Sequence, residues 1–192
     1  MFGLSASGIL TFLGIIFVMV LFYKAFRNDN RQLQNNWSQY FDGMQFSTKE
    51  FYERLQNELS SYHVEDLEIE TIELKQGNVI SSRRLYLQVS WNQFKYDICF
   101  ANFGTAASFV SWWLWRYPPV PELLIATIPV FGVYINKMLY PETYYRIDSA
   151  NSFMAFAQSK VLKIIDELSQ QQKIEALPKH ERFPMKQSLG AI

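Results

Sequence analysis

The longest apolar run of the chain lies at its start. Residues 1–23 contain no charged side chain, and almost every position of residues 9–23 is apolar. As a helix rising about 1.5 Å per residue, this run spans about 34 Å, enough for a bilayer core of about 30 Å. The pattern therefore predicts a single transmembrane helix over residues 1–23. With no basic start and no convincing cleavage site, an uncleaved signal-anchor is favoured over a secretory signal peptide.

Basic residues follow this run and none precedes it. Lys24, Arg27 and Arg31 lie just beyond it, against a single acidic residue, Asp29. The positive-inside rule places the C-terminal side in the cytoplasm. The sequence thus predicts a single-pass protein of the plasma or inner membrane with a cytoplasmic C-terminal domain.

Small residues recur every four positions within the same run, at Gly3, Ser7 and Thr11. Such a stripe lets two helices approach closely, which favours packing against a partner helix. Small residues are also frequent near helix ends, so the stripe does not by itself require a partner.

Residues 24–42 are mostly polar, with apolar residues at steps typical of one helix face. These residues are Phe26, Leu33, Trp37 and Tyr40. We predict a juxtamembrane helix or stalk that continues from the first helix. It is too short for a coiled coil, so packing of Trp37 and Phe41 on the following domain is the preferred interpretation.

Residues 43–177 have the pattern of a small α+β domain. Residues 47–50 (STKE) form a capping box, and an apolar stripe at helical spacing follows it. Period-two alternation over residues 67–71, 85–91 and 94–101 predicts an antiparallel β-meander of three to four strands with one buried face. A second amphipathic helix begins near Asp148 and runs to about Gln172. Residues 178–192 have no periodicity and are predicted to form a mobile tail.

Residues 103–135 are unusual because these 33 residues carry only two charges, Arg116 and Glu122. The aromatic residues beside the arginine resemble an interfacial aromatic belt: Trp112, Trp113, Trp115 and Tyr117. Residues 123–135 are too few to cross a membrane. We predict that residues 103–135 face the bilayer as a surface or re-entrant segment, with ordinary core and a hairpin crossing as the alternatives.

The composition excludes several classes of protein. The chain has 192 residues, with 18 Lys and Arg against 18 Asp and Glu, so its formal net charge is zero and a nucleic-acid partner is not expected. One cysteine cannot form an internal disulfide. With 49% hydrophobic and 17% aromatic residues, most of the chain is expected to fold.

The sequence contains no recognisable catalytic or metal-binding motif, and we predict no enzyme activity, cofactor or metal. A pair of Cys99 and His63 is a poor nucleophile and base, because nearby Asp97 would raise the pKa of the thiol. Asp97 itself is expected to pair with Lys95 or Arg84 across the sheet.

Tyr144, Tyr145 and Arg146 form the most suggestive polar cluster. Arg146 lies between aromatic residues and close to a helix start, where it could hold a lipid phosphate or a partner carboxylate. Local pairing of Arg146 with Asp148 is the preferred alternative.

These features favour a non-enzymatic, membrane-anchored accessory protein that docks on a larger membrane-associated assembly. Its expected partners are membrane lipid together with another protein or further copies of the chain, and no nucleic acid. The alternative is a lipid-binding module that uses residues 103–135. An enzyme built from residues distant in sequence is a remote third class.

Overall fold

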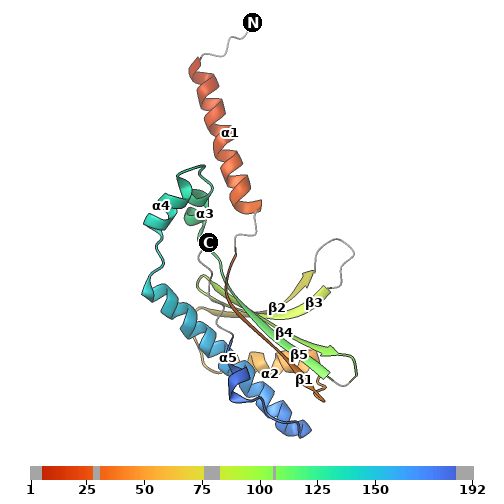
Figure 1. The fold of residues 1–192 in the computed structure, drawn as a ribbon. Coiled ribbons are helices and arrows are strands. Elements are labelled where there is room, and N and C mark those ends of the chain that lie inside the picture. Colours follow the sequence, from red (N-terminus) through yellow and green to blue (C-terminus); the bar gives the residue numbers. More distant parts are fainter. Residues whose placement is uncertain (1–5, 28–30, 76–82, 106, 185–192) are drawn as a thin grey trace. The chain divides into compact units, whose positions relative to one another are not determined.

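The computed structural model describes residues 6–27, 31–75, 83–105 and 107–184 (Figure 1). The chain is an α+β protein. Its contacts divide it into two compact units. The helical unit comprises Met1–Arg31 and Tyr117–Tyr144, and the sheet unit comprises Gln32–Arg116 and Tyr145–Ile192.

The sheet unit is built on five antiparallel strands in the order β1-β5-β4-β3-β2. β1 and β2 are therefore the two edge strands. The bounds are β1 Gln32–Asp42, β2 Leu67–Lys75, β3 Arg83–Trp91, β4 Phe94–Phe103 and β5 Ala107–Arg116.

Two helices, α2 (Thr48–Ser60) and α5 (Tyr144–Gln172), pack on the same face of this sheet (Figure 1). Phe51 of α2 stacks on Phe100 of β4 with ring centroids 4.4 Å apart, and Phe153 of α5 meets Tyr96 edge-on at 6.2 Å. Residues 96 and 100 point to the same side of β4, since side chains alternate along a strand. The core therefore lies between this inner face and the two helices.

The capping box predicted before α2 is confirmed. The Ser47 side chain accepts a hydrogen bond from the Glu50 backbone N–H, and the helix begins at Thr48. Its apolar stripe is buried, with Phe51, Leu55 and Leu59 fully covered.

The helical unit contains α1 (Ala6–Arg27), α3 (Val120–Ala126) and α4 (Gly132–Leu139). α3 and α4 meet closely at Gly132, where a Cβ atom would lie 2.4 Å from the Ile125 carbonyl oxygen. Only glycine fits that contact without a shift of the backbone.

The predicted single transmembrane helix over residues 1–23 is wrong. Within the described residues, no helix has both the length and the apolar content needed to cross a bilayer. The uncharged part of α1 within the described residues, 6–23, is about 27 Å long against a bilayer core of about 30 Å. The predictions of a signal-anchor, of a single-pass membrane location and of a cytoplasmic C-terminal domain depended on that helix and are wrong with it.

The predicted helical stalk over residues 24–42 is also replaced, because Gln32–Asp42 is strand β1. It pairs antiparallel with β5, from Gln32 opposite Arg116 to Asp42 opposite Ala107. Trp37 and Phe41 still pack on the core, as the sequence indicated, but they do so from a strand. With β1 and β5, the sheet has five strands instead of the predicted three to four.

Residues 177–184, which we name the C-terminal strap, are held against the sheet unit although the sequence predicted a mobile tail from residue 178. Leu177 is buried and Lys179–Arg182 form a 3₁₀-helix, η1. Arg182 donates to both carboxylate oxygens of Asp166 on α5 at 2.8 Å. The rest of the predicted tail, residues 185–192, lies outside the described residues.

Candidate binding face of the sheet

The second face of the sheet, which we call the outer face, is covered by neither α2 nor α5. Side chains alternate between the two faces along a strand, so each residue that lies between two core residues points to the outer face. On the two central strands that frame the candidate site they are Lys95, Asp97, Cys99, Ala101, Phe103, Phe109, Ser111, Trp113 and Trp115.

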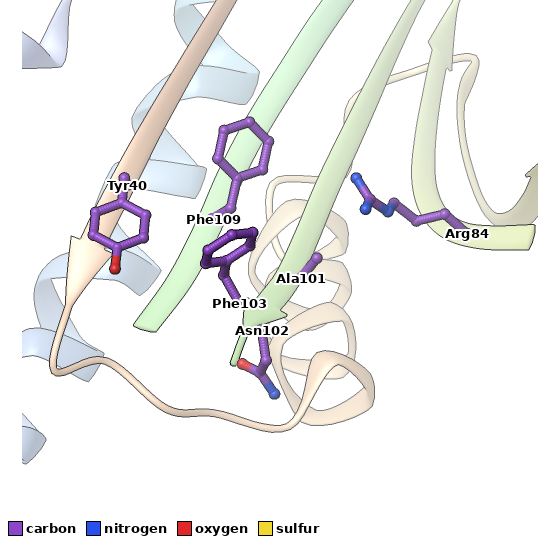
Figure 2. Close-up of a pocket in the computed structure, with 6 residues that line it drawn as sticks. All are labelled: Tyr40, Arg84, Ala101, Asn102, Phe103 and Phe109. Atoms are coloured by element: carbon purple, nitrogen blue, oxygen red, sulfur yellow. The ribbon is translucent and has the colours of Figure 1, made fainter. Parts of the chain in front are cut away.

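A groove of about 300 Å³, the aromatic groove, lies at one end of the outer face. Its lining comes from four strands: Tyr40, Arg84, Ala101, Asn102, Phe103 and Phe109. Figure 2 shows the three aromatic rings gathered on one side of the groove and the Arg84 side chain on the other. Tyr40 and Phe103 are 52% and 70% exposed, so these rings are open to a ligand.

The register of the strands explains why the rings meet. Tyr40 of β1 lies opposite Phe109 of β5, which lies opposite Ala101 of β4. These three residues form one row across the sheet, and the small Ala101 side chain leaves space between Phe109 and Arg84. Phe103, two residues further along β4, closes the row with an edge-to-face contact on Tyr40 at 6.3 Å.

Asn102 anchors the end of β4 instead of offering a free amide to the groove. Its Nδ2 donates to the Phe46 carbonyl oxygen at 3.1 Å, and its Oδ1 lies 2.9 Å from Ser108 Oγ. Arg84 is therefore the charged group that the groove presents to a ligand.

Cys99 lies next to the groove on the same face and is fully buried. Burial raises the pKa of the Cys99 thiol, and the nearby Arg84, Tyr86 and Ser111 side chains only partly oppose this rise. The thiol is thus neutral near pH 7 and is not an activated nucleophile. His63 is exposed beyond the end of α2, where its Nδ1 lies 3.0 Å from the Ser61 carbonyl oxygen.

A buried polar network continues along the outer face. Asp97, only 2% exposed, accepts a hydrogen bond from Gln88 Nε2 at 2.6 Å. Lys95 Nζ donates to Oε1 of the same glutamine at 2.7 Å. The sequence predicted that Asp97 pairs with Lys95 or Arg84. In the structure Gln88 bridges Asp97 and Lys95, so the network links β3 to β4 and fixes this part of the face.

The tryptophans predicted to share one interface lie on opposite faces of β5. Trp112 is fully buried in the core, where it stacks on Tyr96 with ring centroids 4.8 Å apart. Trp113 and Trp115 are half-buried on the outer face and stack on one another at 6.1 Å. The reason is the alternation of a strand, which separates neighbours in sequence.

Arg116 is buried, so it does not form part of an exposed belt. Its Nε donates to Gln93 Oε1 at 3.1 Å and its Nη1 to Gln32 Oε1 at 3.0 Å. These bonds tie the end of β5 to the start of β1 and to the turn before β4, which is a structural role.

The other predicted contact residues lie elsewhere. Tyr117 and Tyr144, in the helical unit, are exposed, as is Tyr145 at the start of the sheet-unit part of α5. Arg146, one residue further along α5, is half-buried. Of the small-residue stripe, Ser7 and Thr11 lie on α1, and Gly3 lies outside the described residues.

The groove residues were not singled out from the sequence. Alternation in residues 84–91 already predicted Arg84 on the polar face of its strand. Tyr40 lies in the segment predicted to be helical, residues 24–42, so the sequence does not place it on the sheet. Across the described part of the chain, no three His, Cys, Asp or Glu side chains gather closely enough to hold a metal ion.

The chain matches no protein-family model and none of the curated proteins. Among solved structures, it is similar to the crystal structure of TTHA0849 from Thermus thermophilus, at 14% identity over 67% of this chain and 97% of that chain. The TM-score is 0.21, and a similarity at this level supports no inference about function.

Proposed function

We propose that the protein is a non-enzymatic interaction protein that docks a segment of a partner protein in the aromatic groove. The observation that carries the proposal is the cluster of the Tyr40, Phe109 and Phe103 rings beside the exposed Arg84 side chain. Exposed aromatic clusters with a nearby arginine are the type of surface that dominates binding energy at protein interfaces.

The lining indicates the chemistry of the docked segment. The three aromatic rings can pack against an apolar side chain. The Arg84 guanidinium can donate charge-assisted hydrogen bonds to a carboxylate. The groove volume of about 300 Å³ is at the lower end of the range for ligand pockets. That volume suits one or two side chains better than a long acyl chain, which favours a peptide over a lipid. The docked segment therefore carries an apolar residue followed or preceded by Asp or Glu.

A display library of random linear peptides, selected on the immobilised full chain, tests the proposal. We expect enrichment of peptides that combine a bulky apolar residue with an acidic one. The substitution Arg84→Glu should lower the affinity of the chain for these peptides by about 10-fold to 100-fold. The reason is that a charge-assisted hydrogen bond contributes roughly 1.5–3 kcal/mol. Selection on the Arg84→Glu variant should enrich basic residues at the same position.

Arg83→Glu is the matched control. Arg83 is the neighbouring residue on β3, points to the opposite face, and lies with its Nη1 3.3 Å from a Glu73 carboxylate oxygen. The Arg83→Glu variant has the same change of charge as Arg84→Glu, but at a residue that does not line the groove. The enriched peptides should therefore bind this variant as they bind the wild type. Equal loss of binding in both variants, or enrichment that ignores residue 84, would contradict the proposal.

A further inference from the structure

The sheet splits at the end that carries the aromatic groove. The pairing of β3 with β4 ends where Leu87 lies opposite Ile98. Beyond this point each strand stays paired with its other neighbour, β3 with β2 as far as Arg83 and β4 with β5 as far as Phe103. Figure 1 shows the start of β3 and the end of β4 diverging. At this end the sheet therefore consists of two parts, the β2–β3 pair and the three strands β1-β5-β4.

The hydroxyl group of Tyr52, a buried residue of α2, lies in this split. It donates to the Leu85 carbonyl oxygen of β3 at 2.9 Å and accepts from the Phe100 N–H of β4 at 3.0 Å. If the register of β3 and β4 continued, Leu85 would lie directly opposite Phe100, so the hydroxyl takes the place of a backbone hydrogen bond. Burial raises the pKa of Tyr52, so the hydroxyl stays protonated and donates and accepts at once.

The neighbouring residue of α2 fixes the position of this hydroxyl. The Phe51 ring stacks on the Phe100 ring with centroids 4.4 Å apart and meets the Tyr52 ring edge-on at 5.9 Å. Phe100 is thus held twice by α2, through its ring and through its N–H. The helix therefore places the Tyr52 hydroxyl at one defined point between the two strands.

The aromatic groove extends across the split. Tyr40, Phe103 and Phe109 belong to the three-stranded part, whereas Arg84 comes from the β2–β3 pair. The continued register would place Arg84 opposite Ala101, at the ordinary strand spacing of about 4.8 Å. Figure 2 shows Ala101 between the aromatic rings and the Arg84 side chain. The distance from the guanidinium to the rings therefore depends on the width of the split.

We propose that Tyr52 is a positioning residue for the recognition of a carboxylate in the aromatic groove. Its hydroxyl fixes the spacing of β3 and β4, and that spacing fixes the place of the Arg84 guanidinium relative to the rings. This inference rests on the proposed function, because the carboxylate is that of the docked segment. The apolar part of the groove does not depend on the hydroxyl, since β1, β5 and β4 stay paired with one another there.

Pairs of peptides that differ in one charge test this role. Each acidic peptide enriched on the full chain is compared with its amide counterpart, in which Asn replaces Asp or Gln replaces Glu. The wild-type chain should bind the acidic peptide about 10-fold to 100-fold more tightly. In Tyr52→Phe this ratio should fall to about threefold or less, while the affinity for the amide peptide changes by less than about twofold. A variant that is merely less stable would lower both affinities alike and keep the ratio.

Two variants serve as controls. Tyr96→Phe removes another buried hydroxyl, which has no hydrogen-bond partner among the described residues and does not line the groove. Ile165→Val removes one buried methylene group from α5 and so lowers stability without changing the split. Both variants should keep the acid-to-amide ratio of the wild type. A fall of the ratio in either control as large as in Tyr52→Phe would overturn the inference.

Nuclear magnetic resonance of the full chain without peptide tests the split itself. Opposed residues of an antiparallel pair alternate between two types, and their α-protons lie close together in the type without hydrogen bonds. Gln88 with Asp97 is such a pair, and Arg84 with Ala101, four residues further, would be of the same type. We expect a strong nuclear Overhauser effect between the α-protons of the first pair and none for the second. A strong effect for Arg84 and Ala101 would show that the strands are closed there and would overturn the inference.

The outcomes separate this inference from the proposed function. Binding that depends on residue 84, with the same acid-to-amide ratio in Tyr52→Phe as in the wild type, upholds the proposed function and overturns the role of Tyr52. Peptides whose binding ignores both residue 84 and their own acidic residue contradict the proposed function. A library from which the full chain retains nothing contradicts both.

Discussion

Two buried tyrosines on facing elements differ in what their hydroxyl groups contact. The Tyr52 hydroxyl, from α2, donates to the Leu85 carbonyl oxygen at 2.9 Å and accepts from the Phe100 N–H at 3.0 Å. The Tyr96 hydroxyl, on the inner face of β4, is fully buried and has no hydrogen-bond partner among the described residues. One hydroxyl therefore ties a helix to two strands, and the other carries only a desolvation cost.

This difference predicts opposite effects of removing the two hydroxyls. Tyr52→Phe should lower the free energy of unfolding by about 1–3 kcal/mol, because it removes the hydroxyl that bonds the buried Phe100 N–H and the part-buried Leu85 carbonyl oxygen. Tyr96→Phe should leave it unchanged or raise it by about 1 kcal/mol, since an unsatisfied polar atom is removed at nearly constant volume. Urea unfolding of both variants measures the effect. A loss for Tyr96→Phe as large as for Tyr52→Phe would show that the Tyr96 hydroxyl has a partner.

The same residues predict how stability depends on alkaline pH. Burial is the main cause that raises the pKa of Tyr52, and it raises the pKa of Tyr96 well above the usual value of 10. Above about pH 10 the unfolded chain releases these protons and the folded chain retains them. Stability should therefore be complete below pH 10 and fall above it, by about 1 kcal/mol per pH unit for each tyrosine. Urea midpoints from about pH 9 to pH 11 measure this slope, which should be shallower in Tyr96→Phe.

The role of a single residue is predictable from the sequence where it depends on near neighbours in the chain. Ser47 caps α2 through residues three positions away, so its role was readable. The positions of Trp112 and Trp113 depend on whether residues 107–116 form a strand and on what covers each face. Because residues 107–115 are apolar at almost every position, their pattern does not show which side chains point to the core. The aromatic groove is not predictable from the sequence either, because it forms only when the register of four strands brings its residues together.

At the scale of elements, regular periodicity was the reliable signal. Apolar and polar residues alternate with a period of two along β3 and β4, and the apolar residues of α2 recur at helical spacing over several turns. β1 was misassigned because its apolar residues are few and happen to stand at helical steps. Pairing with β5 over its whole length outweighs that local preference, since it buries Trp37 and satisfies the backbone. An edge strand rich in Asn and Gln has little strand propensity of its own.

The C-terminal strap is attached by several contacts, of which the Arg182 side chain makes the largest number to α5 and its neighbours. Arg182 makes two bonds to Asp166, and its Nε also donates to the Leu177 carbonyl oxygen at 2.9 Å. Arg182→Ala should loosen the strap, so that its amides exchange hydrogen faster, although the bond from Gln158 Nε2 of α5 to the backbone carbonyl oxygen of residue 182 is kept. The free energy of unfolding should fall by about 1 kcal/mol or less, because both side chains are partly solvated. Lys179→Ala, at an exposed position of η1, is the control. Unchanged exchange in the arginine variant would mean that the contacts of Trp37, Gln39 and Gln158 with the strap are enough to hold it.

At the scale of the whole molecule, the two units bury their apolar residues to different extents. The sheet unit has a closed core in which side chains such as Phe51, Trp112 and Ile165 are fully covered. In the helical unit, large apolar side chains of α1 and α4 are exposed, among them Phe17, Val133 and Met138. Apolar surface of this extent is typical of interaction sites. Because the core of the sheet unit is closed and contains no residue of the helical unit, the fold of the sheet unit should not depend on the helical unit.

A linker replacement tests this independence. The altered chain begins at Arg31 and has residues 118–143 replaced by a Gly/Ser linker of equal length, which keeps the ends of β5 and α5 within reach of each other. We expect cooperative urea unfolding with a midpoint close to that of the full chain, since no residue of the core is removed. We also expect less self-association at high concentration, because the exposed apolar helices are gone. The same linker in place of Thr48–Ser60 is the control, and it should abolish cooperative unfolding because Phe51, Leu55 and Leu59 are lost from the core. Loss of cooperativity in both altered chains would show that the sheet unit needs the helical unit to fold.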